Sequence, residues 1–300
     1  MAPNPSPSEN RITDPSLLEA QDYPNLTGRV ARADNSYAAH TGGYSDVYIG
    51  YFIEDPSFKV AIKVLRTSED QEQIETIRRW LNREAKVWHS LKHKNVLPFL
   101  GLASGFGRFE RCPALIAPYC VNGTVADYVR RSDISESTRV LLVLDVARGL
   151  KYLHEQGVVH GDLKPSNVLM SDKKEPLVCD FGRSLILDMR GFTTRPAGTA
   201  RYQAPELLAG DDVAPNKSAD VCAFALTAFE IWTGVCPFSE CRNDRGIIMQ
   251  VLMAKAQPHL PNPTPAMADM IWPILFPCFD HMPEKRPTMV TLVEQLETCI

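Results

Sequence analysis

The chain has 300 residues, of which 44% are hydrophobic and 23% charged, and its formal net charge is −4. This composition is ordinary for a globular protein that buries a sizeable core or two lobes. The slight negative charge offers no long-range attraction for nucleic acid or for an anionic membrane surface, so we expect neither as a partner.

The N-terminus, MAPNPSPSEN, has neither the basic start nor the apolar core of a secretion signal. The longest mostly apolar stretch, residues 221–238, is interrupted by Glu230 and is too short to predict a membrane-spanning helix. The eight cysteines form no C-x-x-C pair, so we expect reduced thiols packed as small apolar side chains. These features indicate an intracellular protein without a membrane span.

The first half of the chain favours short strands. Residues 1–24 are predicted to be a mobile tail because they are rich in Pro, Ser and Asn and lack periodicity. Residues 68–91 predict one polar helix, and residues 114–117 a short buried strand. Residues 59–65 alternate, which places Lys63 and Ala61 on one face of a strand and apolar residues on the other.

After residue 123 the hydrophobic period becomes helical. Residues 137–155, 221–233 and 287–299 each predict a helix, and in the first of these Leu142, Val146, Leu150 and Leu153 fall on one side. The chain is therefore expected to be an α+β protein of two lobes, with an N-lobe at about 25–117, a hinge at 118–121 and a C-lobe at 122–300. Ligands commonly bind in the cleft of such a layout.

Five short motifs follow one another along these elements. They are VAIK with Lys63, Glu84 on the following helix, HGDLKPSN at 160–167, DFG at 180–182 and APE at 204–206. Each is weak alone, since an isolated Lys63 reads as a solvated lysine and an isolated Glu84 as a surface residue. Their order and spacing resemble the eukaryotic protein kinase family, and the resemblance covers the chain from about residue 25. Stretches such as LKHKNVLPFLG resemble its tyrosine-kinase-like branch, especially the expanded kinases of mushroom-forming fungi.

The resemblance implies a two-lobed kinase fold, with a small antiparallel sheet and one main helix in the N-lobe and a helical C-lobe. It also implies a role for each polar motif residue towards ATP and Mg²⁺. Lys63, held by Glu84, would anchor the α- and β-phosphates, while Asp180 and Asn167 offer the hard oxygen ligands that Mg²⁺ prefers. Two further residues act on the transfer itself: Asp162 would accept the proton of the incoming hydroxyl, and Lys164 would offset charge on the moving phosphate.

By the same resemblance, the adenine would lie among Val47, Ala61 and Leu169, and the hinge would bind it through the Pro118 carbonyl and the Cys120 N–H. A proline at the first of these hinge positions costs nothing because only its carbonyl is used. Ala117 falls at the gatekeeper position, where its small side chain predicts an enlarged back pocket. Packing is the expected role of Cys120 and Cys179, although both thiols lie beside the expected nucleotide site in sequence.

Two of the motifs depart from the family pattern. The expected phosphate-covering loop, HTGGYSDVYIG, retains Gly42 as the only one of the three pattern glycines, with Gly43 beside it, while His40 and Ser45 replace the other two. Gly161 stands where many kinases carry an arginine that binds a phosphorylated activation loop. We therefore expect activation without such phosphorylation, which leaves Thr193 and Thr194 as candidate phosphosites or as ordinary loop hydroxyls.

The remaining matches are expected to be structural or to indicate the substrate. Glu206 and Arg286 resemble the family's buried ion pair, and Asp220 resembles the residue that supports the catalytic loop. Lys164 and Thr199 resemble Ser/Thr kinases, which favours a protein kinase acting on Ser/Thr hydroxyls in signalling. The alternatives are a dual-specificity or tyrosine kinase, a pseudokinase that binds partners without transfer, and, less favoured, a kinase of small molecules.

Overall fold

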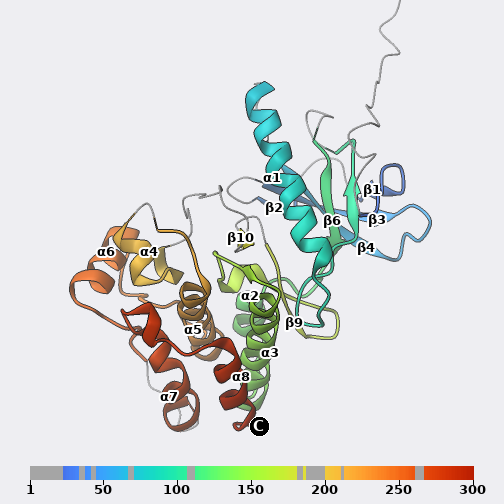
Figure 1. Ribbon diagram of the computed structural model, residues 1–300. Helices are drawn as coiled ribbons and strands as arrows, with labels where there is room; N and C mark the ends of the chain where they lie inside the picture. The colour runs from blue at the N-terminus through green and yellow to red at the C-terminus, as the bar shows by residue number, and fades with distance from the viewer. Residues whose placement is uncertain are drawn as a thin grey trace, which may run out of the picture. The chain divides into compact units, whose positions relative to one another are not determined.

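The computed structural model describes residues 23–33, 38–41, 45–66, 71–106, 112–180, 185–186, 200–210, 213–260 and 267–300. The chain forms two compact units (Figure 1). Unit 1 contains the residues up to His89 together with Phe99–Tyr119, and unit 2 contains Ser90–Pro98 and Cys120–Ile300.

Unit 1 is built on an antiparallel sheet with the order β1-β3-β4-β6-β5, in which β2 also pairs with β3. The strands are β1 (Val30–Arg32), β2 (His40–Thr41), β3 (Ser45–Phe52), β4 (Lys59–Leu65), β5 (Gly101–Ala103) and β6 (Ala114–Pro118), and the helix of this unit is α1 (Gln71–Ser90). The alternation predicted for β4 is confirmed, because Val60 and Ile62 are fully buried in the core while Lys63 points to the other face. The helix predicted at 68–91 is present within those limits.

Unit 2 is mainly helical. Its α-helices are α2 (Val125–Arg131), α3 (Glu136–Glu155), α4 (Pro205–Ala209), α5 (Lys217–Thr233), α6 (Asp244–Ile248), α7 (Trp272–Leu275) and α8 (Met289–Glu297). Short strands β7 (Val158–Val159), β8 (Val168–Met170), β9 (Pro176–Val178) and β10 (Leu185–Ile186) form two antiparallel pairs, β7 with β10 and β8 with β9. Single 3-10 or π turns complete it at Pro165–Asn167, Ala200–Tyr202, Met249–Met253, Met267–Ile271, Phe276–Phe279 and Pro283–Lys285.

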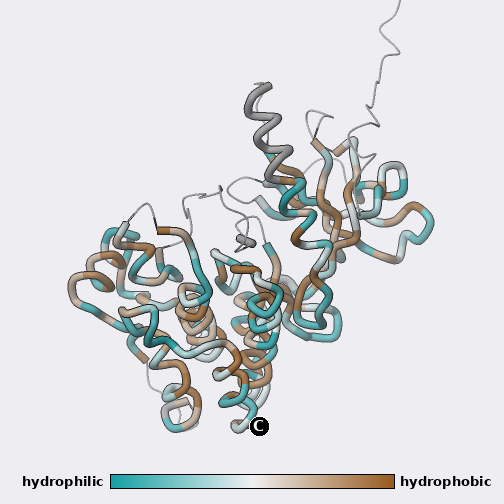
Figure 2. Tube along the Cα trace, in the orientation of Figure 1, coloured by the Kyte–Doolittle hydropathy of each residue, from teal (hydrophilic) through white to brown (hydrophobic). Residues whose placement is uncertain are grey.

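Helix α5 lies at the centre of the hydrophobic core of unit 2. Every residue from Ala219 to Trp232 is buried, and α3 packs against both α5 and α8. Figure 2 draws α5 largely in the hydrophobic colours. Within this buried run lie two acids, Asp220 and Glu230, whose carboxylates need internal partners because burying an unpaired charge is costly.

Side-chain caps set where the three longest helices of unit 2, α3, α5 and α8, begin. The Ser135 side chain accepts a hydrogen bond from the Thr138 N–H and starts α3, one residue before the predicted position 137. Asn216 caps α5 in the same way, so this helix begins four residues before the predicted position 221. Thr288 caps α8, which begins at Met289 and ends at Glu297, inside the predicted segment 287–299. The predicted α+β organisation is confirmed, with end points shifted by these caps.

The boundaries of the units correct one expectation. Residues 90–98, predicted to belong to the N-lobe, belong to unit 2. Backbone pairing explains this, because the Leu97 N–H donates to the Val178 carbonyl and the Val178 N–H donates to the Asn95 carbonyl. Along the chain the units divide between Tyr119 and Cys120, inside the segment expected as a hinge. No helix among the described residues is long and apolar enough to cross a membrane.

Candidate functional site

A buried ion pair joins β4 to α1 in unit 1. Lys63 Nζ lies 2.8 Å from Glu84 Oε1, and the two side chains are only 18% and 6% exposed. The pair predicted from the sequence is therefore present. Because Glu84 is largely removed from water, it depends on Lys63 far more than a surface carboxylate would. Neither residue is the solvated surface charge that each would suggest alone.

In unit 2, the loop between β7 and β8 gathers three of the predicted site residues. Lys164 Nζ donates to Asp162 Oδ2 at 2.9 Å. Asn167 Nδ2 donates to the main-chain carbonyl of Asp162 at 2.7 Å and to its Oδ2 at 3.3 Å. The Asp162 carboxylate is thus held by a cation and an amide, which fix its direction.

Asp220, at the start of α5, accepts hydrogen bonds from the backbone of this loop. Its Oδ2 accepts from the His160 N–H at 2.8 Å and lies 2.9 Å from His154 Nε2, and its Oδ1 accepts from the Gly161 N–H at 2.9 Å. His160 is fully buried, and its Nε2 lies 2.9 Å from the Cys179 carbonyl. The support predicted for Asp220 is present, and it makes the loop backbone a fixed platform.

Gly161 adopts a left-handed backbone conformation, with φ at +76°. Glycine populates this region without the steric cost that a Cβ brings. A glycine therefore suits the backbone conformation of this loop. The sequence comparison with the family pattern had indicated only that an arginine side chain is missing at this position.

Backbone pairing brings the two predicted Mg²⁺ ligands to one end of the β8–β9 pair. The Cys179 N–H donates to the Asn167 carbonyl at 2.9 Å, directly beside the ladder, and Asp180 follows Cys179. Both hydrogen bonds from Asn167 Nδ2 go to Asp162. The amide oxygen of Asn167, Oδ1, is therefore the atom of this side chain that can bind a cation. A carboxylate and an amide oxygen fit Mg²⁺, which usually takes one or two such ligands and completes its shell with phosphate and water.

The residues predicted to contact the adenine come from both units. Val47 lies opposite Lys63 in the β3–β4 register, and Ala117 lies opposite Ala61 in the β4–β6 register. The Tyr119 N–H donates to the Lys59 carbonyl, so the Pro118 carbonyl points away from β4, as expected for the alternating groups of an antiparallel ladder. The Pro118 carbonyl therefore takes no part in the hydrogen bonds between β4 and β6.

In unit 2, Leu169 lies in β8 and Cys120 is buried. Burial, reinforced by the charge of Asp172, raises the pKa of the Cys120 thiol to about 11. The thiol therefore stays protonated at neutral pH and is a poor nucleophile, which favours the packing role expected for it.

Several predicted positions lie outside the described residues. Gly42, Gly43, Phe181, Gly182, Thr193, Thr194 and Thr199 are among them. His40 and Ser45, which replace the other glycines of the expected loop, are described and lie in β2 and β3, where His40 pairs with Val47. Asp180 is the described member of the DFG motif, and it has a left-handed φ of +67°.

The ion pair predicted between Glu206 and Arg286 is present and bidentate. Arg286 Nη1 and Nη2 lie 2.7 and 2.6 Å from the two carboxylate oxygens of Glu206. The guanidinium also donates to the Asp280 and Ser218 carbonyls, and the arginine side chain is fully shielded from solvent. Glu206 adds charge and hydrogen bonding that raise the pKa of Arg286 in spite of its burial.

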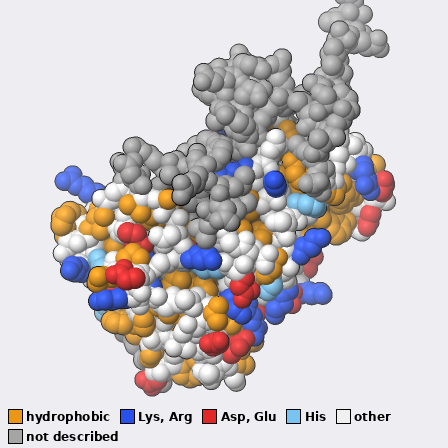
Figure 3. All heavy atoms as spheres, in the orientation of Figure 1, with side chains coloured by type: hydrophobic (Ala, Val, Ile, Leu, Met, Phe, Trp, Pro, Cys, Tyr) orange, Lys and Arg blue, Asp and Glu red, His pale blue; other side chains and the backbone are white. Residues whose placement is uncertain are grey.

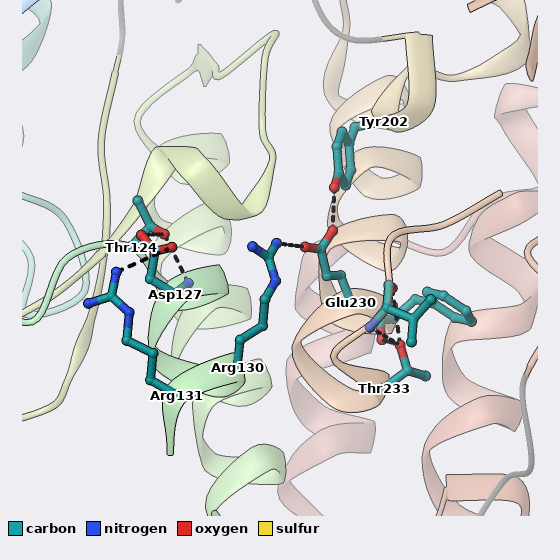
Figure 4. A network of polar contacts seen from close by, with 9 residues as sticks. Thr124, Asp127, Arg130, Arg131, Tyr202, Glu230 and Thr233 are labelled. Atoms are coloured by element: carbon teal, nitrogen blue, oxygen red, sulfur yellow. Dashed lines mark hydrogen bonds and ion pairs between the residues drawn. The ribbon is translucent and has the colours of Figure 1, made fainter. Parts of the chain in front are cut away.

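Figure 4 shows a second network that the sequence did not reveal. Glu230 accepts from Arg130 Nη2 at 2.7 Å and from the Tyr202 hydroxyl through its other oxygen. Burial and then the negative charge of Glu230 raise the pKa of Tyr202. In the sequence, Glu230 indicated only that residues 221–238 were not a membrane helix. Its partners are 100 and 28 residues away, so no local pattern could have revealed them.

A protein-family model described as "Protein kinase domain" matches residues 41–296. The chain belongs to the protein kinase family. The predicted family and fold are thereby confirmed, and the Lys63–Glu84 pair and the Asp162 loop lie within the matched region. Resemblance to the kinases of mushroom-forming fungi is not tested by this match and stays a prediction.

Curated relatives agree with the family. The RGS domain-containing serine/threonine-protein kinase A of Dictyostelium discoideum is 30% identical over 303 residues, covering 96% of this chain and 25% of that protein. Serine/threonine-protein kinase STY46 of Arabidopsis thaliana is 26% identical, with 86% of this chain and 42% of that protein covered. Serine/threonine/tyrosine-protein kinase HT1 of the same plant is also 26% identical, with coverage of 89% and 66%. The chain thus spans between a quarter and two thirds of these relatives.

Proposed function

We propose that the chain is an ATP-dependent protein kinase that phosphorylates Ser/Thr hydroxyls of proteins in intracellular signalling. The observation that supports this most strongly is the held carboxylate of Asp162, with Lys164 Nζ at 2.9 Å and Asn167 Nδ2 at 3.3 Å. Phosphoryl transfer needs little covalent chemistry from the protein but does need positioned charges of this kind. The Lys63–Glu84 pair supplies the second such element.

In the proposed step, a bond forms between the acceptor hydroxyl oxygen and the γ-phosphorus. The bond between that phosphorus and the β–γ bridging oxygen breaks, and ADP leaves. Asp162 orients the hydroxyl and takes its proton, while Lys164 balances the negative charge that develops beside it. Lys63, held by Glu84, binds the α- and β-phosphates.

Asn167 and Asp180 would hold Mg²⁺, which supplies positive charge to the phosphates. The fixed direction of the Asn167 amide and the pairing beside Asp180 support this assignment. Mg²⁺ dependence is open to measurement: transfer should fall to background with excess chelator and return when Mg²⁺ is restored.

Ser/Thr acceptors are supported by the printed descriptions of the relatives, of which HT1 is also described as a tyrosine kinase. Tyr202, Ala204 and Leu207 line a small pocket together with Asp162, so these residues lie close to the proposed base. On the face drawn in Figure 3, acidic and basic side chains are interspersed, which suits protein partners better than nucleic acid.

Phosphoamino acid analysis of casein and myelin basic protein labelled from [γ-³²P]ATP tests the acceptor class. Label on Ser or Thr supports the proposal. Label on Tyr as well supports the dual-specificity alternative, and label on Tyr alone contradicts the Ser/Thr assignment.

One observation favours the pseudokinase alternative. His40 and Ser45 occupy positions where the expected phosphate-covering loop would carry glycine, and both have side chains that restrict close approach of the backbone to phosphate. If this alternative holds, the purified chain binds ATP or a partner and transfers no label above a catalytically blocked variant.

We also propose activation without phosphorylation of the segment before the APE motif, because Gly161 has no side chain to bind a phosphate there. The double substitution Thr193→Ala/Thr194→Ala should then retain most of the wild-type transfer rate in the labelled ATP assay. A near-complete loss of activity with unchanged thermal stability would refute activation of this kind.

A further inference from the structure

The segment from Tyr23 to Thr27, here called the strap, runs along β5, the edge strand of the unit 1 sheet. The Leu102 N–H donates to the Pro24 carbonyl at 3.0 Å, and the Leu26 N–H donates to the Leu102 carbonyl at 2.6 Å. Leu26 is buried in the core, and the Ser104 N–H donates to Thr27 Oγ1 at 3.0 Å. The strap therefore covers an edge that would otherwise expose unpaired backbone groups. Tyr23 and Pro24, expected to belong to a mobile tail, are part of it.

Gly101 makes this close contact sterically possible. A Cβ added at this position would lie 2.3 Å from the Pro24 carbonyl oxygen and 3.1 Å from Leu26 Cγ. Its φ of +148° is also one that residues with side chains rarely adopt. Strand β5 thus has a glycine where the strap lies against it. The absence of a side chain at this position allows the two segments to pack closely.

Tyr23, at the start of the strap, packs against the last part of α1. Its ring meets the His89 ring edge-on, with centroids 6.0 Å apart, and meets Phe99 in the same way at 5.8 Å. Its hydroxyl donates to Asn82 Oδ1 at 3.4 Å. Edge-to-face contacts of this kind are favourable beyond the area they bury.

The contacts of Tyr23 with Asn82 and His89 lie on one side of α1, and Glu84, which holds the proposed phosphate anchor Lys63, points from the other. Asn82 and His89 are seven residues apart and share a helix face, whereas Glu84 is two residues from Asn82 and points to the opposite side. There Glu84 meets Lys63 at 2.8 Å. Helix α1 is therefore held between the strap on one face and the sheet on the other.

We propose that Tyr23 is a positioning residue, which holds α1 where Glu84 can pair with Lys63. The inference rests on the proposed ATP-binding role of that pair. Loss of the Tyr23 ring would lower the population of the paired position of α1, and the apparent affinity for ATP would fall by the same fraction.

Hydrogen–deuterium exchange of residues 81–90 tests the contact without relying on activity. Tyr23→Ala should raise exchange in this part of α1, while Tyr23→Phe, which keeps both ring contacts, should exchange like the wild type. Phe58→Ala is the matched control, because it removes another aromatic ring of unit 1, one whose centroid lies 5.7 Å from that of Phe52. Unchanged exchange in Tyr23→Ala would overturn the proposal.

Steady-state kinetics then test the action through Glu84. Tyr23→Ala should raise the KM for ATP by about fivefold, the effect of losing roughly one aromatic contact, with kcat at saturating ATP near the wild-type value. In a Glu84→Gln background the same substitution should have little further effect, since the two act on one equilibrium. Full additivity, or an equal fall in kcat, would contradict positioning. If the wild type neither binds nor uses ATP, the proposed function fails, and the exchange experiment still decides whether the strap holds α1.

Discussion

Lys63→Met lowers the rate of phosphoryl transfer by at least about a hundredfold if Lys63 anchors the phosphates, the scale expected when one positioned donor is removed. The substitution keeps much of the side-chain length and removes the charge. It also leaves Glu84, whose side chain is 6% exposed, without the partner that balances its burial. The measurement is the initial rate of label transfer from [γ-³²P]ATP at several ATP concentrations.

Lys59→Met is the matched control for this change, because Lys59 is an exposed lysine at the start of the same strand. Its transfer rate should remain within about twofold of the wild type, as expected for a surface charge. Equal rates for the Lys63→Met and wild-type proteins would show that Lys63 is not the anchor, whatever its contact with Glu84.

Glu206→Ala should produce the largest loss of stability in unit 2, about 3–5 kcal/mol in the free energy of unfolding. The guanidinium of Arg286 would keep its buried position and two carbonyl partners but would lose both charged hydrogen bonds. For a unit of this size, such a loss corresponds to a fall in Tm of about 6–20 °C. Thermal unfolding followed by circular dichroism or calorimetry measures it.

The control for this substitution is Glu297→Ala. Glu297 also pairs with an arginine, Arg148, at 2.8 Å, but the two side chains are 47% and 31% exposed. Water and salt screen such a pair, so its removal should cost no more than about 1 kcal/mol. Similar losses in the two variants would mean that burial does not make the Glu206–Arg286 pair exceptional.

Local pattern predicted most of the fold because the elements that carry it have clear periodicity. Val60 and Ile62 alternate with Lys63, and Leu142, Val146 and Leu150 recur along α3, so both elements could be recognised without tertiary information. The end points were less predictable. Helix α5 begins at Lys217 because the Asn216 side chain caps it. A single polar residue in a loop is too weak a signal to predict a cap at that position.

Some of the site residues could likewise be predicted from local sequence, and others could not. Asp162 and Asn167 lie in one short motif, and the Lys63–Glu84 pair follows from a strand and the next helix. The partners of Glu230 could not be predicted, because Arg130 and Tyr202 come from other elements, and their contact depends on how the helices of unit 2 pack. Tyr23 was also missed, since it follows a Pro-rich segment and its aromatic contacts arise only in the folded unit.

Asp162→Ala provides the most direct test of the account, measured as transfer of label from [γ-³²P]ATP to a Ser/Thr protein acceptor. The wild-type chain should phosphorylate the acceptor, and the variant should be slower by about a hundredfold to ten-thousandfold, the usual contribution of a general base. ATP binding should be nearly the same in both, because Asp162 acts on the acceptor hydroxyl. A wild-type rate no higher than that of Asp162→Ala would contradict the proposed kinase activity and favour a binding protein on the kinase fold.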